Sequence, residues 1–138
     1  MKIRGKTVYV YDIEVFQNVF HCTLLNTETE KLVKYECSER KNNIEDMCKL
    51  FITEDAYFAG YNNTHYDNPI INYCIEFFSN SKYTYSKICK SIFNLSNIIT
   101  QDKDNIDSWK RWKYAKNFLT LDSVSYTHLR AHETVLDL

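Results

Sequence analysis

The sequence predicts a single α/β domain built on a mixed β-sheet, and three observations lead to this prediction. Segment 7–16, TVYVYDIEVF, is almost continuously apolar and β-branched or aromatic, which is typical of a strand buried on both faces. Segments 19–25 and 31–37 flank the polar turn NTETE and predict a hairpin beside that strand. A helix, a strand and a further helix follow, and this order of elements is that of an α/β fold with a mixed sheet.

Apolar residues at helical spacing predict three helices. Segment 42–51 has Asn before its apolar stripe and acidic residues in its first turn, segment 66–78 tolerates Pro69 in its first turn, and a third helix is expected near 85–99. The stripes are Ile44, Met47, Cys48 and Phe51; Ile70, Ile71, Cys74, Ile75 and Phe78; and Ile88, Ile92, Leu95 and Ile99. Short strands are expected at 56–62 and 117–122, with a polar loop at 101–109.

Composition limits the class of protein. A chain of 138 residues suits one domain, and no apolar run approaches the ~20 residues of a membrane span, so we expect no membrane partner. The start, MKIRGKTVYV, lacks a small-residue cleavage site, which argues against a signal peptide. The formal charge of −1 argues against a strongly basic nucleic-acid binder, but an enzyme can meet phosphates through metal ions.

The five cysteines stand far apart, are odd in number and form no Cys-x-x-Cys pair; they are Cys22, Cys37, Cys48, Cys74 and Cys89. This spacing argues against a zinc site and against a disulfide framework. We therefore expect buried thiols in a reducing cytoplasm.

The last residues have a different origin in our interpretation. Residues 124–134, VSYTHLRAHET, resemble the translated read-through of a transposase adapter used in sequencing libraries. We therefore expect native sequence over 1–122 and a non-native, adapter-derived tail over 123–138, and we give His128 and His132 no role. The alternative is a genuine C-terminal helix.

The first candidate for chemistry is Asp12-Ile13-Glu14. Residues i and i+2 of a strand project from one face, so both carboxylates point the same way from the central strand. Two unpaired negative charges there are costly, and divalent cations that prefer carboxylate oxygens, such as Mg²⁺, offset the repulsion. The alternative is that Asp12 and Glu14 simply lie at the exposed C-terminal end of a strand.

The second candidate is GYNNTHYDNPII, residues 60–71, which places the only proline and one of the two glycines around Asp67. Asp67 or Asn68 fits the N-cap of the following helix, with Pro69 just inside it. If the strands that end near Glu14 and Gly60 are parallel neighbours, Asp67 also lies beside Asp12. Gly60 would permit a close approach of the backbone or an unusual dihedral.

Together these two stretches resemble the proofreading 3′–5′ exonuclease domain of family B DNA polymerases, particularly phage-type ones. Asp12-Ile13-Glu14-Val15 is similar to the first motif of that family, and Gly60-Tyr61-Asn62 followed by Tyr66-Asp67, Pro69 and Ile71 is similar to the second. The family belongs to the DEDD exonucleases, so the resemblance implies a ribonuclease H-like fold. It covers residues 7–122, and it makes the interior of an infected host cell the expected location.

The resemblance implies specific roles. Asp12, Glu14 and Asp67 would be catalytic ligands of two divalent cations, Mg²⁺ or Mn²⁺, and their oxygens should converge at one edge of the sheet. Asn62 or Asn63, together with Tyr66, would contact the single-stranded 3′ end of DNA, because a Tyr ring can stack on any base. Core packing is the alternative role for Tyr66.

The third motif of the family, a Tyr four residues before an Asp, has no match up to Asp122. The resemblance therefore implies the first part of an exonuclease domain, incomplete at its C-terminal side and inactive or weakly active alone, with a polymerase domain in the same full-length chain. A stand-alone DEDD nuclease acting on DNA or RNA remains open. So does a non-catalytic ribonuclease H-like domain that serves for binding or as a scaffold.

Three further features are ambiguous. WKRWKYAK, residues 109–116, interleaves basic and aromatic residues and fits a nucleic-acid groove, but the usual burial of Trp favours rings that tuck onto the domain. His65 lies near Asp67 and could touch substrate or simply be solvated. Asp122 ends a predicted strand and could cap a following helix, and we assign it no metal role.

Overall fold

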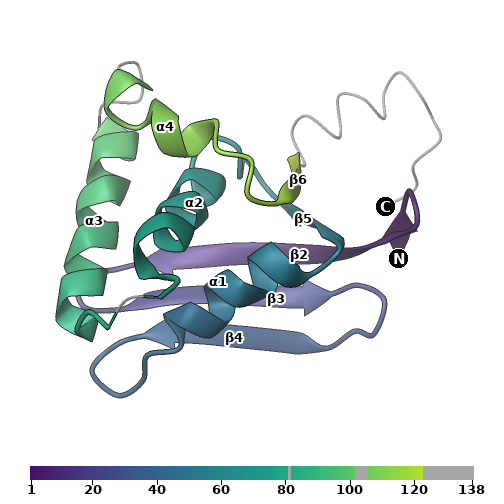
Figure 1. Cartoon of the computed structure of the whole chain (residues 1–138), viewed down its shortest axis with the longest axis horizontal. Helices are drawn as coiled ribbons and strands as arrows, with labels where there is room; N and C mark the ends of the chain where they lie inside the picture. The colour runs from purple at the N-terminus through teal and green to yellow at the C-terminus, as the bar shows by residue number, and fades with distance from the viewer. Residues whose placement is uncertain (81, 102–105, 123–138) are drawn as a thin grey trace.

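A computed structural model of the chain describes residues 1–80, 82–101 and 106–122 (Figure 1). The strands are β1 (Lys2–Ile3), β2 (Lys6–Val15), β3 (Phe20–Asn26), β4 (Leu32–Cys37), β5 (Ala56–Gly60) and β6 (Leu119–Asp122). The helices are α1 (Ile44–Thr53), α2 (Asp67–Phe78), α3 (Tyr85–Gln101), a 3₁₀ turn η1 (Ile106–Ser108) and the short α4 (Lys110–Lys113). The predicted α/β class is confirmed.

The six strands form one mixed sheet in the order β4-β3-β2-β5-β6, with β1 paired to the start of β2. The predicted hairpin is confirmed: β3 pairs antiparallel with both β2 and β4. Strand β5 lies parallel to β2, and β6 lies parallel to β5. The carboxyl ends of β2, β5 and β6 therefore point the same way, which is the arrangement that brings the two motif segments together.

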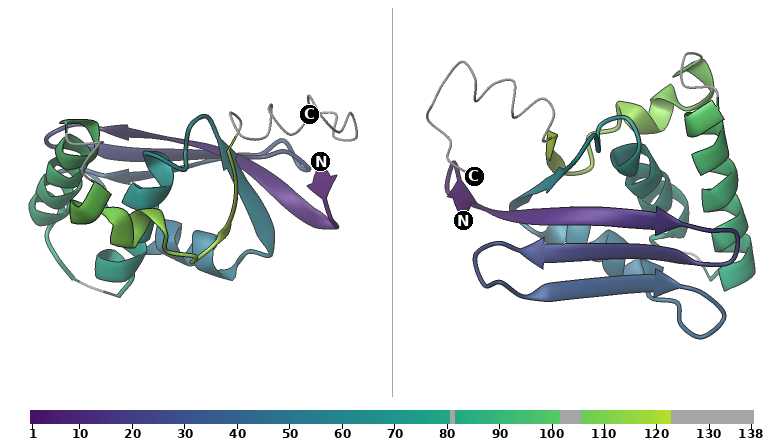
Figure 2. Two further views of the ribbon diagram at one scale, coloured as in Figure 1. Left: turned by 90° about the horizontal axis from the view of Figure 1, so that it is seen from above. Right: turned by 180° about the vertical axis from the view of Figure 1, so that it is seen from behind.

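The helices lie on one side of the sheet, and the other side of β2, β3 and β4 is uncovered, as the two views in Figure 2 show. This corrects the expectation that 7–16 is buried on both faces. From Tyr9 onward β2 alternates: Tyr9, Tyr11 and Ile13 are buried under the helices, whereas Asp12 and Glu14 are exposed on the open side. An antiparallel neighbour with one uncovered face produces this alternation.

The apolar stripes predicted for the three helices face the hydrophobic core. The stripes of α1 and α3 are buried throughout, and in α2 only Ile75 stays partly buried. They meet Phe20, Leu24 and Phe58 of the sheet in one apolar cluster. All five cysteines are buried free thiols, as expected, and burial raises the pKa of Cys48 to about 12, so this thiol stays protonated near neutrality.

The described end of the loop expected over 101–109 forms η1, and the segment that follows it docks on α2 through the short helix α4. Trp109 is 2% exposed, and the Trp112 ring packs edge-on against Tyr73 with its indole N–H donating to Glu76 at 2.7 Å. The buried Asn72 side chain holds the same segment by donating to the Trp112 carbonyl at 2.8 Å. The tucked-ring interpretation of 109–116 is therefore confirmed for both tryptophans, although this packing leaves the nucleic-acid interpretation of the basic residues untested.

The adapter-derived tail predicted over 123–138 lies outside the described residues, so that prediction stays open. Within the described ranges, no helix combines the length and the apolar character that crossing a membrane requires.

Substitution of either glycine by Ala should destabilise the protein, but for different physical reasons. A Cβ on Gly60 would lie 3.1 Å from the Asn63 Cβ and 3.2 Å from the Tyr11 carbonyl oxygen, so Gly60→Ala should lower the free energy of unfolding by about 1–3 kcal/mol. A Cβ on Gly5 would meet nothing within 4 Å, but its φ of +78° makes Gly5→Ala cost about 1 kcal/mol through the backbone.

Urea unfolding of the Ala and Asn variants separates these causes. Asn tolerates a positive φ, so it should recover stability at position 5 and lose more at position 60, where it is larger than Ala. Equal losses for Gly60→Ala and Gly60→Asn would contradict the steric explanation.

Candidate functional site

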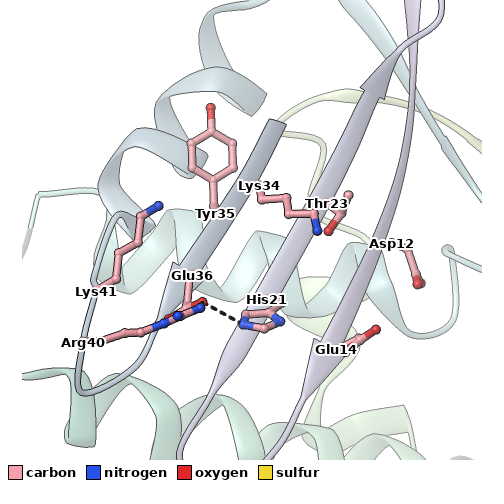
Figure 3. A pocket seen from close by; sticks show the side chains of 9 residues that line it. All are labelled: Asp12, Glu14, His21, Thr23, Lys34, Tyr35, Glu36, Arg40 and Lys41. Atoms are coloured by element: carbon pink, nitrogen blue, oxygen red, sulfur yellow. Dashed lines mark hydrogen bonds and ion pairs between the residues drawn. The ribbon is translucent and has the colours of Figure 1, made fainter. Parts of the chain in front are cut away.

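Asp12 and Glu14 project together from the open side of β2, as their spacing predicts. In the antiparallel ladder Asp12 stands opposite Thr23, and Glu14 stands opposite His21. These residues line one side of a pocket of about 560 Å³ on the open face of the sheet (Figure 3). The two carboxylates are therefore accessible to a ligand or an ion from solvent.

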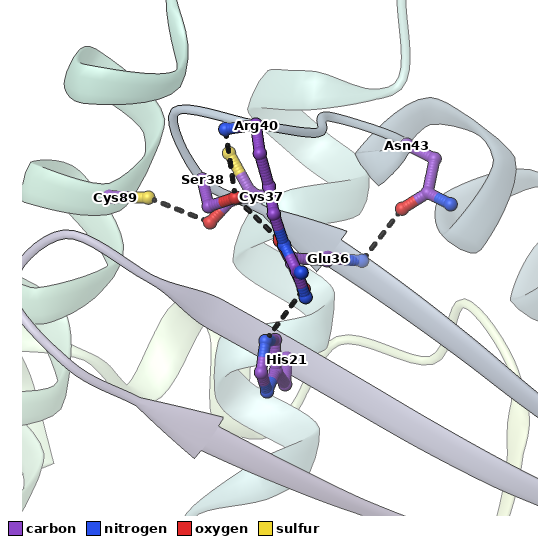
Figure 4. Close-up of polar contacts among 7 residues, drawn as sticks. All are labelled: His21, Glu36, Cys37, Ser38, Arg40, Asn43 and Cys89. Atoms are coloured by element: carbon purple, nitrogen blue, oxygen red, sulfur yellow. Dashed lines mark hydrogen bonds and ion pairs between the residues drawn. The ribbon is translucent and has the colours of Figure 1, made fainter.

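The opposite wall of this pocket is an ion network centred on Glu36 of β4 (Figure 4). Arg40 donates from Nε and Nη2 to the two carboxylate oxygens of Glu36 at 2.7 and 2.8 Å, and Ser38 Oγ donates at 2.5 Å. His21 Nε2 lies 3.0 Å from Glu36 Oε1. These hydrogen bonds, led by those from Arg40 and Ser38, hold the pKa of Glu36 well below its usual range.

Within this network Glu36 neutralises the charge of Arg40, so part of the positive charge on this wall is already paired. Arg40 is committed to Glu36, while Lys34 and Lys41, which also line the pocket, form no ion pair within the described residues. The pocket thus places two free lysines opposite two free carboxylates. The charges that line the pocket are balanced, and its carboxylate side, formed by Asp12 and Glu14, is the part that could bind a cation.

Asp67 is the first residue of α2 and lies at the edge of the sheet. Strand β5 pairs with β2 only as far as Val10 opposite Ala59, whereas β2 continues to Val15. The Asp67 carboxylate accepts a hydrogen bond from the backbone N–H of Ile13, beyond the last β5 pair. The expected N-cap role is wrong: Tyr66 is the N-cap residue, and Asp67 and Asn68 lie within the first turn.

The environment of Asp67 disfavours its charge. The side chain is buried, and burial raises its pKa to about 7, with the charge of Asp12 as the next cause and that of Asp122 after it. The Ile13 N–H opposes this shift only in part. Asp67 therefore senses the charge of Asp12, while the predicted sharing of a cation by these carboxylates stays a prediction.

Asp122 fixes the loop that leads from β5 into α2. Its two carboxylate oxygens accept hydrogen bonds from the backbone N–H groups of Asn62 and Thr64, both at 3.1 Å. The prediction that Asp122 could cap a following helix concerns residues outside the described part of the chain and stays open. The structure shows Asp122 holding an earlier loop across the sheet. The parallel pairing of Gly60 with Asp122 explains this, because the end of β6 faces the turn that follows β5.

A buried amide network supports the same loop from below. Asn63 Nδ2 donates to Asn68 Oδ1 at 3.2 Å and to Thr120 Oγ1 at 2.9 Å. Asn68 also accepts from the Tyr11 hydroxyl and donates to Thr120 Oγ1 at 2.7 Å. Strands β2 and β6 and the first turn of α2 are thereby connected through polar side chains, of which Asn63 and Asn68 are buried.

These contacts describe the surroundings of the predicted substrate-binding residues. Asn63 is fully buried in the network, so it does not face solvent in this conformation, and its role as a substrate contact stays a prediction. Asn62 is exposed and adopts a φ of +53° at the tip of the turn. Tyr66 is half-buried, and its hydroxyl lies 2.7 Å from Ser96 Oγ of α3, which combines a packing role with a fixed, partly accessible ring.

The carboxylates do not converge fully. Within residues 1–80, 82–101 and 106–122, no three His, Cys, Asp or Glu side chains lie close enough together to hold one metal ion. Asp12 and Glu14 face the open side, and Asp67 is held at the edge between them and the helices. The donor set nevertheless fits a divalent cation in chemistry, because it consists of carboxylate oxygens, and one of them is buried beside other acids.

Comparisons of the chain with protein-family models, with curated proteins and with solved structures found no match.

In metal-free buffer, Asp67 should make the folded state less stable as the pH rises. Above about pH 4 the unfolded chain has released this proton, whereas the folded state keeps it until about pH 7. The stability of wild type relative to Asp67→Asn should therefore fall by at most ~1.4 kcal/mol per pH unit across that window and stay level above it. Urea unfolding of both proteins in EDTA measures the difference, and a difference that is constant with pH would contradict the assignment.

Asp122→Asn should loosen the turn before α2. An amide keeps one acceptor oxygen but presents an NH₂ group to the second backbone N–H, so we expect a loss of about 1–3 kcal/mol. Hydrogen exchange should quicken at the Asn62 and Thr64 amides more than in α1. Unchanged protection of both amides would show that Asp122 does not hold the turn.

Proposed function

We propose that this chain is the first part of a two-metal 3′–5′ exonuclease domain that removes nucleotides from the 3′ end of single-stranded DNA. The observation that carries the proposal is the placement of buried Asp67 beside Asp12 at the carboxyl end of the central strand, where its pKa is raised. Carboxylates whose environment disfavours their charge are frequent at functional sites. Two stretches of sequence separated by about fifty residues meet at this point.

The fold supports the proposal. In order along the chain, the five principal strands are arranged 3-2-1-4-5, with the first three antiparallel and the last two parallel to the first. This is the arrangement expected of a ribonuclease H-like sheet, in which acids from the first strand and from a helix after the fourth strand share a site. The chain supplies acids at both places, Asp12 and Glu14 on β2 and Asp67 on α2.

The roles of the residues follow from their surroundings. Divalent cations, when bound, would lower the pKa of a bound water and stabilise the leaving 3′ oxygen. Asp12 and Glu14 offer accessible oxygens, and Asp67 has to release its proton near neutral pH before it can act as a ligand. Asn62 and the ring of Tyr66 would orient the strand, and contacts of this kind read no sequence.

A non-catalytic domain of the same fold is the second candidate. It is favoured by the observation that the three carboxylates do not form a three-ligand group within the described residues. Such a domain would retain Asn62 and Tyr66 for strand binding and would hold no cation through Asp12.

Metal binding by the chain itself separates these candidates. Titration with Mn²⁺ followed by electron paramagnetic resonance should show a site in wild type that Asp12→Asn weakens by at least about tenfold, because an amide cannot neutralise the cation. Asp46→Asn is the matched control, since Asp46 is exposed in the first turn of α1 away from the site. Equal Mn²⁺ affinity in the two variants would favour the non-catalytic domain.

Activity is tested in a longer protein that contains 1–122 and continues beyond Asp122. There, Asp12→Asn should reduce metal-dependent 3′–5′ degradation of labelled single-stranded DNA by orders of magnitude and leave polymerisation intact. Degradation at the wild-type rate would refute the exonuclease proposal. The present chain should degrade DNA weakly or not at all, since the precise positioning that catalysis needs depends on a complete site.

A further inference from the structure

A second groove lies between the turn that carries Asn62 and the segment around α4. It has a volume of about 600 Å³. One wall comes from that turn, with Asn62, His65 and Tyr66, and the other comes from Trp109 and Lys113 around α4, while the last turn of α3 closes it. We call it the Tyr66–Lys113 groove.

The groove begins next to the candidate carboxylates. Tyr66 immediately precedes Asp67, and its hydroxyl is fixed against Ser96 of α3 at 2.7 Å, so the ring is held in place. A strand whose 3′ end lies at Asp67 and Asp12 would leave the site past Asn62 and Tyr66. Because Asn62 and Tyr66 also line the groove, the nucleotides that precede the 3′ end would enter it.

The lining of the groove suits a phosphodiester chain. Among the residues that the structure describes, its lining contains no carboxylate, and its permanent positive charge comes from Lys113. Two aromatic rings position this lysine: its Nζ lies 5.6 Å from the centroid of the Trp109 ring and 5.5 Å from that of Tyr114. The Tyr114 ring is 65% exposed and offers a stacking surface beside the lysine.

The other basic residues of 109–116 are committed elsewhere or point elsewhere. Lys110 pairs with Asp107 at 3.3 Å, and Arg111 pairs with Glu76 of α2. Lys116 lines a different pocket, at the edge of β6. Lys113 is the one cation of this segment that combines a place in the groove with freedom from ion pairs within the described residues.

Trp109 forms a buried part of the groove wall. It lines the groove at 2% exposure, and its indole N–H has no hydrogen-bond acceptor within the described part of the chain. A buried donor without an acceptor is unfavourable, but this nitrogen is closed to solvent, so an oxygen atom in the groove would reach it only if the ring shifted.

We propose that the Tyr66–Lys113 groove binds the sugar–phosphate backbone of single-stranded nucleic acid upstream of its 3′ end, with Lys113 as the phosphate contact. This inference rests on the proposed function for the direction of the strand. The residues around α4 then extend the site from the terminal nucleotide to the strand that precedes it. Lys113 acts as a binding and positioning residue and takes no part in the chemistry.

Fluorescence anisotropy of a labelled oligothymidylate, titrated with the full 138-residue chain in EDTA, tests the groove without any metal chemistry. Lys113→Met keeps the stem that packs on the rings and removes the charge. It should weaken binding on the order of threefold to tenfold at low salt and reduce the slope of log affinity against log salt by about 0.7, the value for one phosphate contact on a single strand. Lys113→Arg should retain both.

Lys110→Met is the matched control, because it removes the same charge from the same short helix but from a side chain that pairs with Asp107 outside the groove. Equal losses in Lys110→Met and Lys113→Met would overturn the proposal, since general charge would then explain binding. Absence of measurable binding by wild type would overturn it too. Displacement by polyglutamate as effective as by unlabelled oligothymidylate would assign the groove to an acidic peptide instead.

The two proposals fail separately. If Asp12→Asn loses degradation while Lys113→Met keeps the salt slope of wild type, the exonuclease proposal stands and the proposal for the groove is refuted. A Lys113-dependent slope together with wild-type degradation in Asp12→Asn would leave a strand-binding domain without the assigned chemistry. Thermal unfolding of Lys113→Met should give the same midpoint as wild type, which would confirm that any loss of binding comes from the contact.

Discussion

The early end of β5 determines how the candidate site is built. The pairing of β5 with β2 stops at Ala59, and the central strand runs on to Val15 paired with β3 on its other side. Its backbone N–H groups on the β5 side then need acceptors, and Asp67 supplies one to Ile13. A carboxylate that is needed to complete the edge of the sheet cannot move freely into solvent. The constraint thus keeps Asp67 buried and close to Asp12, and it fixes where α2 begins.

The remaining geometry follows from closing the short loop that this termination creates. The chain has to turn from Gly60 into α2 within a few residues, and a Cβ at Gly60 would crowd Asn63. Asp122 accepts two backbone N–H groups of the turn, and the buried Asn63 amide anchors it from below. Because Asp122 also raises the pKa of Asp67, the residue that orders the loop contributes negative charge to the site. Structural order and electrostatic strain therefore come from the same side chain, and a proton or a bound cation relieves the strain.

Much of this architecture could be predicted from the sequence because local patterns decide it. The apolar stripes of α1 and α3 fix which helix faces are buried, and the hairpin is encoded by its flanking strands and polar turn. The uncovered face of β2 could not be predicted, since β-branched and aromatic residues occur in strands with one or two buried faces and only the side on which the helices pack decides. The burial of Asn63 depends on a network with Asn68 and Thr120, whose members are distant in sequence. The contact of Asp122 with the turn before α2 could not be predicted for the same reason, because its partners lie about sixty residues earlier in the sequence.

The segment around α4 shows how the fold selects among charges that the sequence presents together. Four basic residues between Trp109 and Lys116 suggest a uniformly positive patch. Docking of Trp109 and Trp112 places Arg111 against Glu76, and the turn of α4 places Lys110 against Asp107. These pairs reduce the field that the segment presents to solvent, which agrees with a nearly neutral chain. What remains in the groove is a single lysine, Lys113, which lies near two aromatic rings, while Lys116 lines a different pocket. Recognition of a polyanion by such a surface depends on position more than on net charge, so a chain with a formal charge of −1 can bind phosphates locally.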